Sequence, residues 1–365
     1  MTSFYKKYLL PGFVFQGIVI GGGYATGREL AEFFMPHGFL GGLLSMLVAA
    51  LVWSLVMAVS FEICRITKEY DYQSFFKQLL GRFWFLYEIL YSLLILIVLS
   101  VIGAASGEIV QNIFAIPTTI GIVGLFVVIG LFTFYGSAVI EKFMGSWSIL
   151  LYTCFFLLVV FSFVYFGEDI KTNYKENVIT SGWFTDGVRY AGYNIAAVPA
   201  VFFSLKHITK RKEAISSGIL AGIIAIIPAI FLFIAMMSKY PEINQAAVPS
   251  TALLLHMDLP WFSILFQVVL LGTLVQTGVG LIHAINERIA ATLASKNKKM
   301  PKLARPAVAI IILLIALFLA SRFGIIQLIA NGYGILTIGF IAVFVIPVLT
   351  IGMYKIIVQS RENSN

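Results

Sequence analysis

The sequence has little charge. Only 12% of its 365 residues are Asp, Glu, Lys or Arg, whereas 60% are hydrophobic, and the mean hydropathy is +0.96. An ordinary soluble domain has about 25% charged residues, because charge covers the surface that faces water. This composition excludes a soluble globule and predicts an all-α, polytopic membrane protein whose main partner is the lipid bilayer.

Cysteine is also scarce. Cys64 and Cys154 lie inside apolar runs, where a thiol behaves as a small hydrophobic side chain, so we assign them no disulfide, redox or metal role. The sequence lacks the H-E-x-x-H, G-x-S-x-G and P-loop motifs, and its predicted spans contain no aspartate. These absences argue against an enzyme, against an organic cofactor and against ATP hydrolysis by this chain.

Long apolar runs separated by short polar loops dominate what is present. Because a helix needs about 20 residues to cross a bilayer, the runs predict ten transmembrane helices in one membrane domain. Their approximate bounds are 8 to 35, 39 to 63, 84 to 113, 117 to 135, 138 to 166, 187 to 205, 214 to 238, 260 to 290, 305 to 321 and 324 to 357.

The basic residues give the orientation. With this set of spans, 19 of the 25 Lys and Arg residues fall on the side of the membrane that carries both termini. Cytoplasmic loops are enriched in Lys and Arg, so both termini are predicted to be cytoplasmic. The net charge of +8 then reflects membrane orientation, and we expect no nucleic-acid partner.

The first predicted span contains three adjacent glycines, Gly21, Gly22 and Gly23. Each glycine costs a helix about 1 kcal/mol relative to alanine, so the run predicts an opened turn. Unwound backbone is tolerated at membrane depth where it lines a cavity, and its free carbonyl and amide groups can hold ions or solutes. Glycines that serve only for close helix packing are an alternative, but such glycines are typically spaced by four residues.

The sixth predicted span has a similar interruption, with Gly192, Asn194 and Pro199 in one short run. The two interruptions lie in the first helix of each half of the chain. Because each half has an odd number of spans, the second half must be inverted relative to the first. We therefore predict two inverted five-helix repeats, about 8–166 and 187–357, with helices one and six broken, which is typical of secondary transporters.

This pattern resembles the LeuT fold of the amino acid, polyamine and organocation transporter superfamily. More narrowly, GGGYATGRELAEFF, residues 21 to 34, resembles the first-helix signature of the YkvI-type bacterial membrane proteins. The resemblance implies a multi-pass protein of the bacterial plasma membrane. It also implies a secondary active transporter, a symporter of a small organic solute such as an amino acid or a related amine or carboxylate. A Na⁺ or H⁺ gradient would drive it through alternating access. The alternative is a solute sensor that has the same fold and does not transport.

Polar residues near the two breaks are the candidates for solute binding. They are Gly21, Gly22, Gly23, Tyr24, Ser100, Tyr193, Asn194 and Gln276. Arg28 and Glu108 lie on the predicted outer halves of spans one and three, and an intramembrane charge usually pairs with another. We expect them to form an outer gate. Pairing of Arg28 with Glu32, one turn further along the same helix, is the alternative.

The resemblance also implies candidates for ion coupling. In sodium-coupled members of the fold, hydroxyl groups of the eighth helix join carbonyls of the first, which points to Thr273, Thr277 and Gly21 as ligands of Na⁺. A hard cation of this kind prefers oxygen ligands. Two alternatives remain: Thr277 bonds to a carbonyl of its own helix, or protons carried by Glu108 or His283 drive transport.

Overall fold

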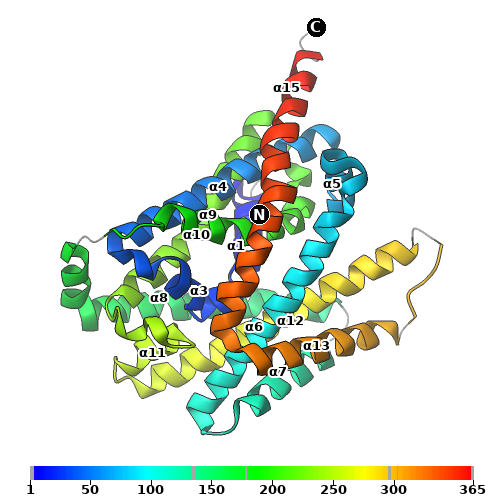
Figure 1. The fold of residues 1–365 in the computed structure, drawn as a ribbon. Coiled ribbons are helices and arrows are strands. Elements are labelled where there is room, and N and C mark those ends of the chain that lie inside the picture. The colour runs from blue at the N-terminus through cyan, green and yellow to red at the C-terminus, as the bar shows by residue number, and fades with distance from the viewer. Residues whose placement is uncertain (1–3, 133–136, 177–178, 295–296, 302, 363–365) are drawn as a thin grey trace.

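The computed structural model describes residues 4–132, 137–176, 179–294, 297–301 and 303–362, and within these ranges every regular element is a helix (Figure 1). A short π-helix, η1 (Tyr5–Leu9), leads into the first helical stretch. The first half then contains α1 (Leu10–Val19), α2 (Gly22–Ala25), α3 (Arg28–Phe33), η2 (Met35–His37), α4 (Gly38–Thr67), α5 (Tyr72–Leu80), η3 (Gly81–Phe83), α6 (Phe85–Phe114), α7 (Thr118–Phe132) and α8 (Ser137–Glu176).

The second half begins with α9 (Trp183–Asn194), which continues as a 3-10 helix, η4 (Ile195–His207). It is followed by α10 (Arg211–Met237), η5 (Glu242–Gln245), α11 (Pro249–Leu255), α12 (Pro260–Ala294) and α13 (Ala304–Gln327). The C-terminal part is one nearly continuous helical stretch built from η6 (Leu328–Tyr333), α14 (Gly334–Phe340), η7 (Ile341–Val345), η8 (Val348–Gly352) and α15 (Met353–Glu362).

Six stretches of the described chain are long and apolar enough to cross a membrane. They are Arg28–Thr67, Phe85–Phe114, Leu150–Lys175, Arg211–Met237, Pro260–Ala290 and Ala304–Gln359. The last one passes through Gly324, the first residue of the last predicted span, where a φ of 68° interrupts the helical geometry. The chain is therefore an all-helical membrane protein in its described part, while the count of ten spans and the inverted repeat remain predictions.

The helix α4 shows how one sequence faces both lipid and protein. Leu47, Leu51 and Leu55 recur every four residues and are more than half exposed, which places them on one stripe. Trp53 on the same helix is fully buried and meets Phe15 of α1 edge to face, with ring centroids 5.3 Å apart. The exposed stripe fits the bilayer, and the other face packs on α9 and α10, which run beside α4 (Figure 1).

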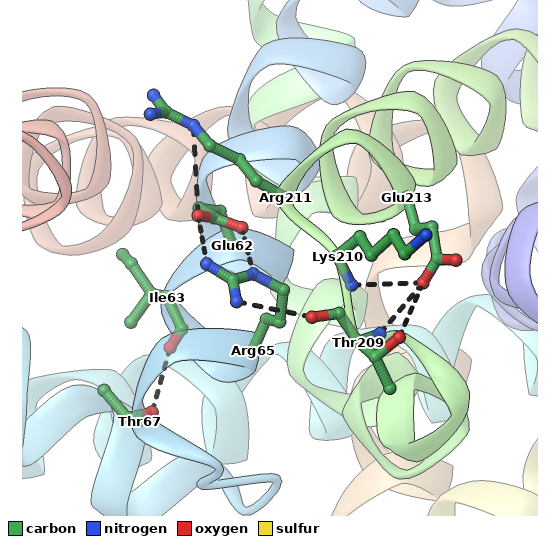
Figure 2. A network of polar contacts seen from close by, with 8 residues as sticks. All are labelled: Glu62, Ile63, Arg65, Thr67, Thr209, Lys210, Arg211 and Glu213. Carbon is green, nitrogen blue, oxygen red and sulfur yellow. Dashed lines mark hydrogen bonds and ion pairs between the residues drawn. The ribbon is translucent and has the colours of Figure 1, made fainter. Parts of the chain in front are cut away.

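A polar network joins the end of α4 to the start of α10 (Figure 2). Glu62 is 1% exposed and accepts two hydrogen bonds from the Arg65 guanidinium, at 2.7 and 2.8 Å. Arg65 also donates to the carbonyl of Thr209 at 3.4 Å, and Arg211 approaches Glu62 to 4.0 Å. These contacts satisfy a carboxylate that would otherwise be buried without a partner, and they fix how the two helices meet.

Candidate functional site

The first helical stretch is interrupted at Ile20 and Gly21, within the region that the glycine run predicts. Ile20 has a ψ of 75° and Gly21 is extended, and the chain becomes helical again at Gly22. A Cβ atom added to Gly22 would collide with Ile102 of α6 and would lie 3.3 Å from the Leu274 side chain of α12. The absence of a side chain at Gly22 therefore lets α2 lie directly against α6 and α12.

A second turn follows at Gly27, which has a φ of 77°, in the left-handed region that favours glycine. Thr26, just before it, donates from its hydroxyl to the carbonyl of Gly23 at 2.9 Å. The Thr26 carbonyl in turn accepts a hydrogen bond of 3.0 Å from the backbone of Ser250. This turn redirects the chain, so that the first residues of α3 fold back toward α2.

The sixth predicted span changes from an α-helix to a 3-10 helix at Ile195, close to the predicted interruption, and Pro199 lies within η4. Neighbouring helices supply donors to its backbone carbonyls. The Tyr87 hydroxyl donates to Ala196 at 3.0 Å, and the Trp53 indole donates to Ala191 at 3.2 Å. These side chains hold an altered helix in a defined position at the centre of the protein.

A cavity of about 70 Å³ lies where the two interrupted stretches meet. Six of the predicted site residues line it: Gly21, Gly22, Gly23, Tyr193, Asn194 and Thr277. Glu29, Tyr91 and Tyr333 also line it and were not among the predicted ligands. The structure thus gathers backbone from the first break, two residues of α9 and one hydroxyl of α12 around one space.

The remaining predicted residues lie outside the lining of this cavity. The hydroxyls of Ser100 and Thr273 bond to carbonyls of their own helices, Leu96 at 2.7 Å and Val269 at 2.9 Å. Tyr24 is fully buried on α2 and Gln276 is 8% exposed on α12. A buried Ser or Thr can bond to a carbonyl of its own helix or face a cavity, and the sequence alone does not distinguish the two cases.

Glu29 is the acidic side chain of the cavity. It is 4% exposed, and within the described chain no Lys, Arg or His forms an ion pair with it. Its Oε2 atom is buried without a hydrogen-bond partner among the described atoms. Four tyrosines lie near enough to interact with the carboxyl electrostatically: Tyr24, Tyr190, Tyr193 and Tyr333. The position of Glu29 beside the glycine run in a membrane helix was the signal in the sequence that could have identified it.

On the predicted outer side, Arg28 closes the turn between α2 and α3. Its guanidinium lies 3.2 Å from the carboxylate of Glu32, and its Nη1 atom donates to the carbonyls of Asn244 and Ala246, at 2.6 and 3.0 Å. The observed partner is therefore Glu32, one turn along the same helix, and not Glu108 as expected. The reason is geometric, because residues four apart share a helix face, while carbonyls of the connection after α10 accept hydrogen bonds from Nη1.

On the other side of the cavity, Arg288 of α12 connects α5 and α6. Its guanidinium pairs with Glu88 at 3.1 Å and lies over the rings of Tyr72 and Tyr91, 4.1 and 3.9 Å from their centroids. Burial raises the pKa of Tyr72, on the amphipathic helix α5, to about 12, so its phenol is neutral beside this cation. Tyr91 lines the cavity, so this cluster separates the cavity from the end of the helices that carries Arg288.

The backbone of the first break also faces α12. A Cβ atom built on Gly21 would lie 3.4 Å from Thr277 Cγ2 and 3.7 Å from its hydroxyl oxygen. The structure thus brings together Gly21 and Thr277, two of the three residues predicted for ion coupling. It separates them from the Thr273 hydroxyl, which bonds within its own helix.

Comparison with known proteins identifies related folds. No model of a known protein family matches the chain. The sequence is 22% identical to the uncharacterized membrane protein YkvI of Bacillus subtilis over 312 residues. The match covers 78% of this chain and 82% of that protein. This similarity agrees with the resemblance of residues 21 to 34.

Solved structures match over nearly the whole chain. MhsT in complex with L-phenylalanine is 15% identical with a TM-score of 0.57, over 96% of this chain and 97% of that one. The manganese transporter of Eremococcus coleocola is 14% identical with a TM-score of 0.55, and the match covers 93% of this chain and 78% of that one. A Na⁺-coupled sialic acid symporter is 13% identical with a TM-score of 0.55, and the match covers 95% of this chain and 86% of that one. The chain has the fold of the LeuT-fold transporters and resembles YkvI in sequence.

Proposed function

We propose that the protein is a secondary active transporter that binds a small organic solute in the cavity between the two interrupted helical stretches. The observation that carries this proposal is the convergence of the Gly21 break, the end of α9 before Ile195 and the Glu29 side chain on one cavity. Interrupted helices that meet at a buried cavity are typical of transporter binding sites.

The contacts on either side of the cavity support alternating access. Arg28 and the carbonyls of Asn244 and Ala246 close one side, and the Arg288 cluster with Tyr91 closes the other. A transporter must open these two closures in turn, through movement of the first and sixth helical stretches against the rest. An amino acid or a related amine or carboxylate is the proposed solute class.

A Na⁺ gradient is the proposed driving force, and the proximity of Thr277 to the Gly21 backbone supports it. Mn²⁺ would need its own oxygen or nitrogen ligands. Within the described residues no group of three or more His, Cys, Asp and Glu side chains is placed to hold a metal ion. The likeness to the manganese transporter is one of fold.

Uptake into proteoliposomes tests the proposal. The purified protein is reconstituted and offered a panel of amino acids, amines and carboxylates under imposed Na⁺ or H⁺ gradients. We expect one class to accumulate against its gradient only when the ion gradient is present. Saturable binding without accumulation would instead identify a sensor with a transporter fold. Gly22→Leu, which fills the space against Ile102, should abolish binding in a folded protein, and intact transport by this variant would contradict the site.

A further inference from the structure

We propose that Glu29 binds the ammonium group of the solute, so that this cavity selects protonated amines. The inference rests on the proposed transport function and narrows its substrate class. It assigns the Glu29 carboxylate as a direct ligand, with the aromatic rings around the cavity completing the cation site.

The burial of Glu29 is the first argument. A carboxylate taken out of water loses several kcal/mol of solvation, which a partner must replace. Within the described chain no cationic side chain pairs with Glu29, and its Oε2 atom has no hydrogen-bond partner. Its neighbour Arg28 points to Glu32 and to the carbonyls after α10. The partner that this acid lacks is absent from the described protein, and the ammonium group of a bound solute would supply it.

The second argument is that the backbone is built to place Glu29 in the cavity. The turn at Gly27, with its φ of 77°, folds α3 back onto α2. A Cβ atom on Gly23 would overlap the Glu29 carboxyl group and lie 2.8 Å from its Cγ and Cδ atoms. A side chain at position 23 would therefore displace the carboxylate. Two glycines thus make room for one buried acid.

The third argument is the chemistry of the remaining lining. Tyr91, Tyr193 and Tyr333 line the cavity, and the rings of Tyr193 and Tyr333 stack with centroids 4.3 Å apart. Ammonium groups are attracted to aromatic faces, more strongly when water is excluded. None of the described residues that line the cavity is Lys, Arg or His, so a purely anionic solute would find no opposite charge.

The size of the cavity limits the solute. One water molecule needs about 10–15 Å³ of such a space, and the cavity has about 70 Å³. The volume therefore fits a solute with on the order of five non-hydrogen atoms. A small primary amine, or an amino acid with a short side chain, meets both the charge and the size.

The test compares solutes that differ only in charge. The full-length protein in lipid nanodiscs is titrated calorimetrically with primary amines from ethylamine to hexylamine, and with the alcohol and the carboxylate of each chain length. We expect saturable binding of at least one amine, with a preference of about tenfold or more over its alcohol and its carboxylate, equivalent to about 1.4 kcal/mol. Glu29→Gln keeps the shape of the side chain and should remove this preference.

Glu168→Gln is the matched control, since Glu168 is an exposed acid that pairs with Lys171 on the surface. It should keep the full amine preference. The thermal melting of each variant reports its folding. If Glu29→Gln does not fold, the wild-type protein still tests the cation site, because equal binding of the amine, the alcohol and the carboxylate would refute it.

Three results of the binding experiment would overturn the inference. They are no binding of any amine, equal binding of the alcohol or carboxylate, and an amine preference that survives Glu29→Gln. In the last case, a variant that loses only its H⁺ dependence would assign Glu29 to proton coupling. Uptake of solutes without an ammonium group would leave the transport proposal intact and refute this inference. Selective amine binding without any uptake would support the role of Glu29 and refute the transport proposal.

Discussion

The guanidinium of Arg288 lies over the ring of Tyr91, with its central carbon 3.9 Å from the ring centroid. The same guanidinium pairs with Glu88 at 3.1 Å and covers Tyr72. Tyr91 lines the cavity, so one face of this tyrosine is held by a cation from α12 while its helix borders the proposed binding site. The contact joins α12, α6 and α5 at a single residue, and in the proposed transport cycle it closes the cavity on the side opposite Arg28.

Arg288→Ala should open this end of the cavity. The change removes the ion pair and the contact that holds Tyr91, so we expect the equilibrium between the closed and open forms to shift by about 1.4 kcal/mol toward the open form. The labelling rate of a residue in the cavity should then rise about tenfold. The measurement is the labelling rate of Ala197→Cys, a cavity position, by a membrane-impermeant thiol reagent. Both native cysteines, Cys64 and Cys154, are buried and are replaced by alanine in the background.

Arg82→Ala is the control for this experiment, because Arg82 is exposed and its guanidinium lies over the ring of its neighbour Phe83, with the central carbon 4.9 Å from the ring centroid. Its labelling rate should match that of the parent. An equal rise in both variants would show a general loosening of the fold and would contradict a gate at Arg288.

The pairing of Arg28 is open to a double-mutant test. Arg28 and Glu32 are one turn apart and 3.2 Å from each other, whereas the sequence favoured Glu108. A cycle with Arg28→Ala and Glu32→Gln should give a coupling of about 0.5 kcal/mol in thermal stability, typical of a partly exposed pair. The matched cycle with Glu108→Gln should give about zero, because residues without contact are additive. Coupling to Glu108 alone would contradict the observed pairing.

Gly22→Ala should disturb the first break in a way that a second change can relieve. The added methyl would collide with Ile102 on α6, so we expect transport to fall about tenfold or more, as displacement of a packed core residue costs 1–3 kcal/mol. Ile102→Ala should restore part of the activity by making room. Gly17→Ala on α1 is the control, because nothing lies within 4 Å of its added atom. Failure of the double variant to recover would show that Gly22 acts through its backbone conformation.

The sequence predicts the long helices closely. The apolar runs at 84 to 113 and 214 to 238 correspond to α6 and α10, which the structure places at Phe85–Phe114 and Arg211–Met237. The break at Gly21 was also visible, because adjacent glycines remove both packing and helix propensity. Local composition is sufficient for such features.

The lining of the cavity was harder to predict from the sequence, because its side chains come together through turns and long-range packing. Glu29 reaches the cavity only because Gly27 redirects the chain, and Tyr91 and Tyr333 arrive from helices distant in sequence. Ser100, by contrast, looked like a ligand and bonds to its own helix. A polar residue in a membrane helix is therefore a candidate ligand, and the fold determines whether its side chain faces the cavity.

Thr277→Val and Thr273→Val separate two hydroxyls that the sequence treats alike. Both changes replace a hydroxyl with a methyl group of similar size. Thr277 lies beside the Gly21 backbone, so a Na⁺ ion held there would lose one oxygen ligand, and the Na⁺ concentration for half-maximal uptake should rise about tenfold or more. The Thr273 hydroxyl already donates to Val269, so its loss should cost about 0.5–1.5 kcal/mol of stability and leave the Na⁺ dependence unchanged. Uptake measured against Na⁺ concentration at fixed pH distinguishes the two. If both variants keep the wild-type Na⁺ dependence, the coupling ion does not bind at Thr277, and a proton gradient becomes the driving force to test.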